Sequence, residues 1–263
     1  MRLWLGLILA ASSAIARDNG VPVLKTASGH SIQYYLSLPH GWTAQKTWPV
    51  VVVIEAAERE FRSTAELFAK ARGDRPFILA TPLVTTNGGP NYRQAPGYTY
   101  TEEAWKEIER TGRCTFDMEG IAAVARDIRA SFGGADRYYV TGLEAGGHTV
   151  WALLFRHPEA LRAVAPVATN FAGRCMEDGA FHAGVPDLPV RVFAGDRNPG
   201  WKAGAYLYDQ SHRAEELAAQ HGFRNVQDVA APGKGHEHLA DEVLAYFYSD
   251  WTGGGAQSSR PGR

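Results

Sequence analysis

Five consecutive β-branched residues, Val50–Val51–Val52–Val53–Ile54, constrain the fold of this chain most strongly. A strand with one face in water alternates apolar and polar side chains, whereas a continuous apolar run is typical of a strand buried on both faces of a parallel sheet. Further strands are expected at 33–38, 77–81, 137–141, 164–168, 190–194 and 226–230, and helices at 63–71, 117–132, 146–157, 214–221 and 238–248. This alternation predicts an α/β fold: a mainly parallel sheet with helices on both faces.

The first residues have the features of an export signal. Arg2 supplies a positive charge, residues 3–11 form an apolar run, and residues 13–16 end in a pattern of small residues that signal peptidase accepts. The run is too short to span a bilayer, which takes about 20 residues. We therefore expect residues 1–16 to be a cleaved signal peptide, no membrane span, and a secreted or periplasmic protein.

One domain is expected to occupy residues 17–252, because this length suits a single α/β unit. The segment 253–263 has almost no apolar side chain to bury and predicts a flexible tail. The formal net charge is −1 and the basic residues are scattered, which argues against nucleic acid as a partner. A small-molecule or polymer substrate is expected, with no cofactor, and the oligomeric state is left open.

Cys114 and Cys175 are the two cysteines of the chain. An even count in an exported protein favours a disulfide between them, although two unpaired buried thiols are the open alternative. Neither cysteine lies in a CxxC pair or near a histidine, so the sequence predicts no metal site at either cysteine.

The segment 138–147 reads as a strand, a tight turn flanked by glycine, and a helix. This is the local structure of a nucleophile elbow, whose usual pattern is Gly-x-Ser-x-Gly. Gly142 and Gly146 fit the two glycine positions, where a turn packed between strand and helix leaves no room for side chains. The central position, however, is occupied by Glu144.

With this elbow, the chain resembles the secreted esterases of the α/β-hydrolase superfamily, in particular the polyhydroxybutyrate-depolymerase and feruloyl-esterase-like group. The openings Leu-Pro-His-Gly-Trp at 38–42 and Trp-Pro-Val-Val-Val at 48–52 carry the resemblance further. In that group an oxyanion loop of the type His-Gly-Ala-Gly-Glu-Arg follows, where this chain has Ile-Glu-Ala-Ala-Glu-Arg at 54–59. The resemblance implies the α/β-hydrolase fold for the mature chain.

The resemblance also implies the site residues. Glu144, Asp196 and His236 are expected at the triad positions, in the chain order that this fold uses. The residues expected to form the oxyanion and binding region are Glu55, Ala56, Ala57 and Ala145. His238 is a weaker candidate than His236 because it lies at the start of the last predicted helix.

A glutamate has no hydroxyl proton to give up, so ordinary serine-esterase chemistry is not expected. If the protein is active, we expect hydrolysis through carboxylate or general-base chemistry by Glu144 with His236 and Asp196. The main alternative is an inactive, ligand-binding pseudoenzyme. Two further alternatives rest on proximity alone: Glu55 and Glu144 as an acid and base pair on a glycoside, or as ligands of a divalent cation with His236.

His148 and a set of aromatic residues also lie near the predicted site. His148, just past the elbow, is expected to pack near the sheet rather than to take part in catalysis. The aromatic residues expected either to wall a substrate cleft or simply to pack together are Tyr92, Tyr98, Tyr100 and Trp105.

Overall fold

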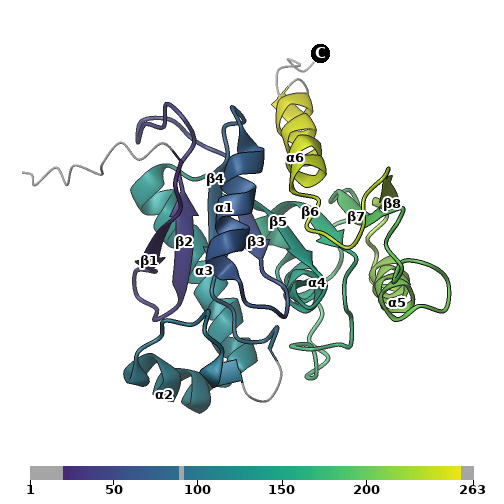
Figure 1. Cartoon of the computed structure of the whole chain (residues 1–263), viewed down its shortest axis with the longest axis horizontal. Coiled ribbons are helices and arrows are strands. Elements are labelled where there is room, and N and C mark those ends of the chain that lie inside the picture. The colour runs from purple at the N-terminus through teal and green to yellow at the C-terminus, as the bar shows by residue number, and fades with distance from the viewer. Residues whose placement is uncertain (1–19, 89–91, 256–263) are drawn as a thin grey trace, which may run out of the picture.

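The computed structural model describes residues 20–88 and 92–255 (Figure 1), so the predicted signal peptide lies outside the described residues. The strands are β1 (Val23–Thr26), β2 (Gln33–Ser37), β3 (Val50–Ile54), β4 (Ile78–Pro82), β5 (Tyr138–Leu143), β6 (Leu161–Val167), β7 (Val190–Gly195) and β8 (Val226–Ala231). The helices are α1 (Phe61–Arg72), α2 (Glu102–Thr111), α3 (Arg113–Phe132), α4 (Gly146–Arg156), α5 (Tyr206–Gln220) and α6 (Ala240–Gly255), with short 3₁₀ turns η1 (Tyr92–Gln94) and η2 (Pro158–Ala160).

The eight strands form one sheet in the order β1-β2-β4-β3-β5-β6-β7-β8. The pairs β1/β2 and β2/β4 are antiparallel, and every other neighbouring pair is parallel. All five residues of β3 are buried, as its β-branched run predicted. The predicted mainly parallel sheet is confirmed.

Helices cover both faces of this sheet. One face carries α1 and α6, whose Phe68, Leu244 and Phe247 pack on Val51 and Val53 of β3. The other face carries α3, α4 and α5, with Val124 and Trp151 among the residues that pack on Val50 and Val52. The helices on both faces were predicted, and they leave the carboxyl ends of the parallel strands as the edge where loops gather.

Two elements were not predicted. Strand β1 lies at the edge of the sheet with Val23 and Leu24 exposed, so its sequence lacks the alternation that marks a strand with one buried face. Helix α2 follows the glycine- and proline-rich loop, and it begins with Thr101 accepting a hydrogen bond from the Ala104 N–H. Acidic Glu102 and Glu103 complete a helix-start signal that the sequence already contained.

The last helix, α6, extends to Gly255, three residues into the segment predicted as a tail. Residues 256–263, the rest of that segment, lie outside the described residues. No helix in the described part of the chain is both long and apolar enough to cross a membrane.

The predicted disulfide between Cys114 and Cys175 is present, with 5.2 Å between the two Cα atoms. It links the start of α3 to the long connection between β6 and β7. On either side of it, Arg113 donates to the carbonyls of Thr85 and Gly88, and Arg174 donates to that of Thr86. The disulfide and its two flanking arginines therefore fix three loops at the carboxyl edge of the sheet.

Candidate functional site

The turn between β5 and α4 is an elbow, with Glu144 at its tip. Glu144 has φ 47°, in the left-handed region that non-glycine residues seldom adopt. Its N–H donates to Val167 O at 3.1 Å, and its carbonyl accepts from the N–H groups of Gly147 and Asn170, both at 2.9 Å. Three backbone hydrogen bonds thus hold the strained residue in place.

The glycines that flank the elbow are required by packing. A Cβ at Gly146 would lie 2.7 Å from the carbonyl oxygens of both Ile54 and Glu55, and one at Gly142 would lie 2.9 Å from a methyl of Val150. The helix therefore approaches the end of β3 more closely than a side chain allows. This agrees with the reason given for both glycines from the sequence.

The side chain of Glu144 is half-buried at this edge. Its Oε2 is buried and has no hydrogen-bond partner among the described residues. A carboxylate oxygen without a donor is costly in a folded protein, and such groups are concentrated at functional sites. The buried, unpartnered Oε2 therefore makes the elbow the part of this edge at which to look for a ligand.

His236 follows β8, and its partner in the structure is Asn198. Nδ2 of Asn198 lies 3.2 Å from Nδ1 of His236. Asp196, which the sequence predicted as this partner, is exposed, and its Oδ1 accepts the N–H of Gly233 at 2.7 Å. Asp196 thus fixes the turn before His236, while the buried Asn198 contacts the imidazole.

The reason for the difference is position. Asp196 comes directly after Gly195, the last residue of β7, so its side chain leaves the sheet at the strand end. A turn then brings the N–H of Asn198 back to Gly195 O at 3.0 Å, and the Asn198 side chain contacts His236. Sequence reasoning selected Asp196 by residue type, and only the path of the loop identifies Asn198.

The amide of Asn198 also determines which nitrogen of His236 carries a proton. Oδ1 of Asn198 accepts the N–H of Gly200 at 2.9 Å, so the other end of the amide, the NH₂, faces His236. An NH₂ group only donates, which makes Nδ1 of His236 the acceptor. Neutral His236 therefore carries its proton on Nε2, opposite to the tautomer of a serine-hydrolase triad, where Nδ1–H donates to a carboxylate.

Glu55 does not line this site. The side chains of Val51 and Val53 face α1 and α6, and because side chains alternate along a strand, Glu55 follows them to that face. The residue is 2% exposed. Its carboxylate accepts the hydroxyl of Thr64 and, at 3.3 Å, the N–H of Glu60. Glu55 and Glu144 are neighbours along the backbone of β3 and β5, but Glu55 points beneath α1.

Burial raises the pKa of Glu55 to about 7, against the opposing effect of its hydrogen bonds from Thr64, Glu60 and Ala56. His238 lies beside it, with Nε2 3.7 Å from Glu55 Oε2. Burial lowers the pKa of His238 to about 4, so between about pH 4 and pH 7 an uncharged acid faces an uncharged imidazole. His238 therefore packs under the sheet edge, in line with its standing as the weaker candidate.

The other residues predicted for the oxyanion and binding region lie where expected along the chain. Ala56 and Ala57 follow β3, and the carbonyl of Ala56 is held by the side-chain amide of Asn87 at 2.9 Å. Ala145 is the N-cap of α4 and is buried. The N–H groups at the start of a helix favour a negatively charged oxygen, and α4 begins next to Glu144.

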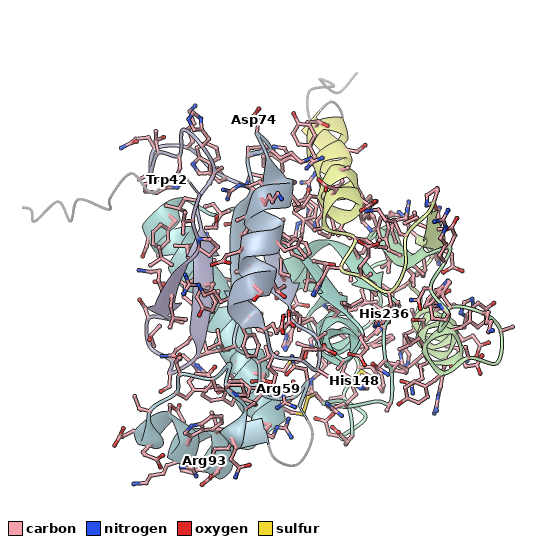
Figure 2. The ribbon with its side chains drawn as sticks, viewed as in Figure 1. Trp42, Arg59, Asp74, Arg93, His148 and His236 are labelled. Carbon is pink, nitrogen blue, oxygen red and sulfur yellow. A yellow bond between two sulfur atoms is a disulfide. The ribbon has the colours of Figure 1, made fainter. Side chains whose placement is uncertain are left out.

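His148 lies in the first turn of α4 and is 7% exposed. Burial, reinforced by the charge of Arg174, lowers its pKa to about 4, and its Nδ1 is buried without a partner among the described residues. In Figure 2, Arg59 and His148 lie below the sheet, at the edge where its parallel strands end, and His236 lies to their upper right. Trp42 and Asp74 lie at the opposite end of the sheet.

The aromatic loop is packed rather than open. The rings of Tyr98, Tyr100 and Trp105 contact one another at centroid distances of 5.3 to 5.9 Å. The hydroxyls of Tyr98 and Tyr100 donate to the carbonyls of Val84 and Leu83. These contacts favour the packing role over the cleft-wall role.

A cavity of about 360 Å³ lies near, but not at, the elbow. It is lined by residues of the β6–β7 connection and α5, among them Phe171, Met176, Phe181 and Leu217. None of the predicted site residues lines it, so the polar edge around Glu144, rather than this cavity, is the candidate site.

Comparison with known proteins supports the fold. No protein-family model and no curated protein sequence matches the chain. Among solved structures, LpqC, a poly(3-hydroxybutyrate) depolymerase from Bordetella parapertussis, is 20% identical with a TM-score of 0.57, over 85% of this chain and 84% of that one. Poly(aspartic acid) hydrolase-1 from Sphingomonas sp. KT-1 is 14% identical with a TM-score of 0.58, over 88% and 98% of the two chains.

Est1E from Butyrivibrio proteoclasticus is 12% identical with a TM-score of 0.54, over 88% of this chain and 99% of that one. These likenesses extend over most of each chain and show a shared fold. The chain therefore has the α/β-hydrolase fold of the esterases and depolymerases, as the elbow and its flanking motifs predicted. Fold alone does not transfer an activity, so the chemistry has to be argued from the site.

Proposed function

We propose that this protein is an exported hydrolase that cleaves ester bonds with the carboxylate of Glu144 as general base. The observation that carries this proposal is the hydrogen bond from Asn198 to Nδ1 of His236. It leaves His236 as an N–H donor, while Glu144 supplies the unpartnered electron pair. In an ordinary triad the histidine accepts the proton of the serine. Here Glu144 accepts a proton and His236 donates one.

The reaction then needs two proton transfers, one from water to Glu144 and one from Glu144 to the leaving alcohol. Glu144 takes a proton from water as the water oxygen attacks the ester carbonyl carbon. The carbonyl oxygen becomes an oxyanion, which the Nε2–H of His236 and the N-terminal end of α4 stabilise. When the tetrahedral intermediate collapses, the carbon–oxygen bond of the leaving alcohol breaks, and protonated Glu144 returns the proton to that oxygen.

A covalent route is less consistent with the site. Direct attack by Glu144 on an ester would give an anhydride, whose hydrolysis calls for a base at His236. The orientation of Asn198 places the Nε2 proton where that base would have to accept one. A neutral amide also gives no charge stabilisation to a protonated imidazole, unlike the aspartate of a triad.

Support for ester-type substrates comes from the similar structures, which include a poly(3-hydroxybutyrate) depolymerase and esterases. Export is proposed from the features of residues 1–16 and agrees with the Cys114–Cys175 disulfide, because disulfides persist in oxidising compartments.

A second candidate is a protein that binds a ligand without converting it. It is favoured by buried polar atoms that lack partners among the described residues on three elements near the elbow: Glu144 Oε2, His148 Nδ1 and Asn87 Oδ1. Each is an atom to which a bound polar ligand would supply the missing partner. The replaced oxyanion loop at 54–59 fits this candidate as well.

The first experiment is a panel of short-chain aryl esters and a feruloyl ester, incubated with the purified protein in H₂¹⁸O. General-base hydrolysis places ¹⁸O in the released acid alone. A covalent route forms an anhydride on Glu144, and ¹⁸O enters Glu144 whenever water attacks the glutamyl carbonyl, so label in the Glu144 peptide after a single turnover, detected by mass spectrometry, would overturn the general-base route. If no ester is consumed but the ester still binds, the ligand-binding candidate is correct.

A further inference from the structure

Three side chains with metal-binding atoms meet where α5 packs beside β8. His212 and Glu215 lie on α5 three residues apart, so they share one face of the helix, and Asp228 lies on the neighbouring strand β8. One ligand atom from each lies within 4.8 Å of the other two. The sequence predicted no metal ligands here, because the helix and strand residues are separated along the chain.

His212 is oriented as a metal ligand is. Its Nδ1 lies 2.9 Å from the carbonyl oxygen of Tyr208, and since a carbonyl only accepts, Nδ1 carries the proton. Nε2 then has a free electron pair, and it lies 3.6 Å from Oδ2 of Asp228. A metal-bound histidine typically has its other ring nitrogen held in this way. The ring also stacks on Tyr208, with 3.8 Å between centroids.

The two carboxylates face each other without a cation. Oε1 of Glu215 is buried and has no hydrogen-bond partner in the described part of the chain. Within residues 20–88 and 92–255, no lysine or arginine forms an ion pair with Glu215 or Asp228. Two carboxylates and Nε2 of His212 thus converge on one point.

We propose that His212, Glu215 and Asp228 form a binding site for one divalent transition-metal ion of the Zn²⁺ type. One imidazole nitrogen and two carboxylate oxygens are ligands that Zn²⁺ accepts, with water in the remaining position. With bonds of about 2.1 Å, tetrahedral ligands lie about 3.4 Å apart, close to the 3.6 Å between His212 and Asp228. Asp228 is exposed and gives the ion a path from solvent.

The site is connected to the loop that holds Asn198. The ring of Trp201 contacts the rings of both Tyr208 and His212, at 5.7 and 5.9 Å between centroids. The backbone N–H of Trp201 donates to the backbone carbonyl of Asn198 at 3.0 Å. A metal ion that fixes His212 therefore also restricts the loop from which Asn198 reaches His236, which gives the ion a structural rather than a catalytic role.

The test uses untagged protein that has been stripped with a chelator and dialysed. Isothermal titration with Zn²⁺ is expected to show one ion per chain, and Co²⁺ is expected to give the visible absorption of a site with mixed nitrogen and oxygen ligands. Glu215→Gln and Asp228→Asn are expected to weaken Zn²⁺ binding at least about 100-fold, more than the loss of a residue that only orients a ligand. Glu216→Gln, the exposed neighbour on α5, is the matched control and is expected to bind as the unmodified protein does.

Folding is checked in the same variants. Because the metal-free protein places two carboxylates together, Asp228→Asn is expected to raise the melting temperature without metal and to abolish its increase with Zn²⁺. Equal Zn²⁺ affinity in Glu215→Gln, Asp228→Asn and Glu216→Gln would overturn the proposal, as would the absence of stoichiometric binding to the unmodified protein.

Discussion

The side-chain amide of Asn198 lies 3.2 Å from Nδ1 of His236, in the position where a serine hydrolase has a carboxylate. The amide is 5% exposed and is oriented by the N–H of Gly200, so its NH₂ end faces the histidine. In the proposed mechanism, therefore, an uncharged amide contacts His236 and Glu144 supplies the carboxylate.

This relationship predicts how a serine triad is restored. Glu144→Ser alone is expected to give little esterase activity, because His236 already carries a proton on Nε2. Adding Asn198→Asp turns Nδ1 into a donor and frees Nε2, and kcat/KM for an aryl ester is expected to rise by about 10² to 10⁴ over Glu144→Ser. The measurement is the initial rate of phenol release by the two variants.

Asp196 provides the control for that comparison. It is exposed and bonded to the Gly233 N–H, so Asp196→Asn in the doubly substituted protein is expected to change the rate less than about threefold. A large loss with Asp196→Asn, together with no gain from Asn198→Asp, would assign the acid position to Asp196.

The pair of Glu55 and His238 predicts a pH effect on stability. The pKa of Glu55 is raised from 4.5 to about 7, so folding takes up a proton in this window, and the stability from Glu55 is lost as pH rises towards 7. The pKa of His238 is lowered from 6.5 to about 4, so its contribution changes in the opposite direction, increasing as pH rises through that window. In the unmodified protein the two effects largely cancel.

Glu55→Gln removes the first effect and keeps the second. The difference in the free energy of unfolding between this variant and the unmodified protein is expected to shift in favour of the variant by about 2 to 3 kcal/mol as pH rises from about 5 to about 7.5. Urea unfolding at several pH values measures this difference. The exposed Glu60→Gln is expected to follow the unmodified protein, and parallel pH curves for Glu55→Gln and the unmodified protein would show that Glu55 is ionised when folded.

The elbow predicts a packing effect at Gly146. Gly146→Ala places a Cβ 2.7 Å from two carbonyl oxygens at the end of β3, and it is expected to lower stability by about 1 to 3 kcal/mol. Gly253→Ala in α6 meets no atom within 4 Å and is expected to be neutral or to stabilise by up to about 1 kcal/mol. Equal melting temperatures in the two variants would contradict the close contact between α4 and β3.

The disulfide is expected to stabilise the fold substantially. Cys114 and Cys175 are 61 residues apart, and closing a loop of this length is worth about 4 kcal/mol in the chain-entropy model. Replacing both with serine is expected to lower the free energy of unfolding by about 2 to 5 kcal/mol. Chemical denaturation with and without a reductant measures this change, and a reductant effect that is also seen in the double-serine variant would assign it to something other than the disulfide.

Much of the fold was predictable because it depends on local patterns. The buried run at Val50–Ile54 and the glycines at 142 and 146 identify a parallel sheet and an elbow before any contact is known. Side-chain alternation in β3 also contains the information that Glu55 faces away from the site, although the predicted oxyanion role obscured it. Asn198 was not predictable from residue type, because the path of a loop decides which of two polar residues contacts His236.

The measurement that most directly tests the central proposal is kcat/KM for an aryl ester with the unmodified protein and with Glu144→Gln. Glutamine keeps the shape of the side chain but accepts no proton from water, so we predict a loss of about 10² to 10⁴. The exposed Glu103→Gln on α2 is the matched control and should retain full activity. Equal rates for the unmodified protein and Glu144→Gln would show that Glu144 is not the base and would contradict the proposed mechanism.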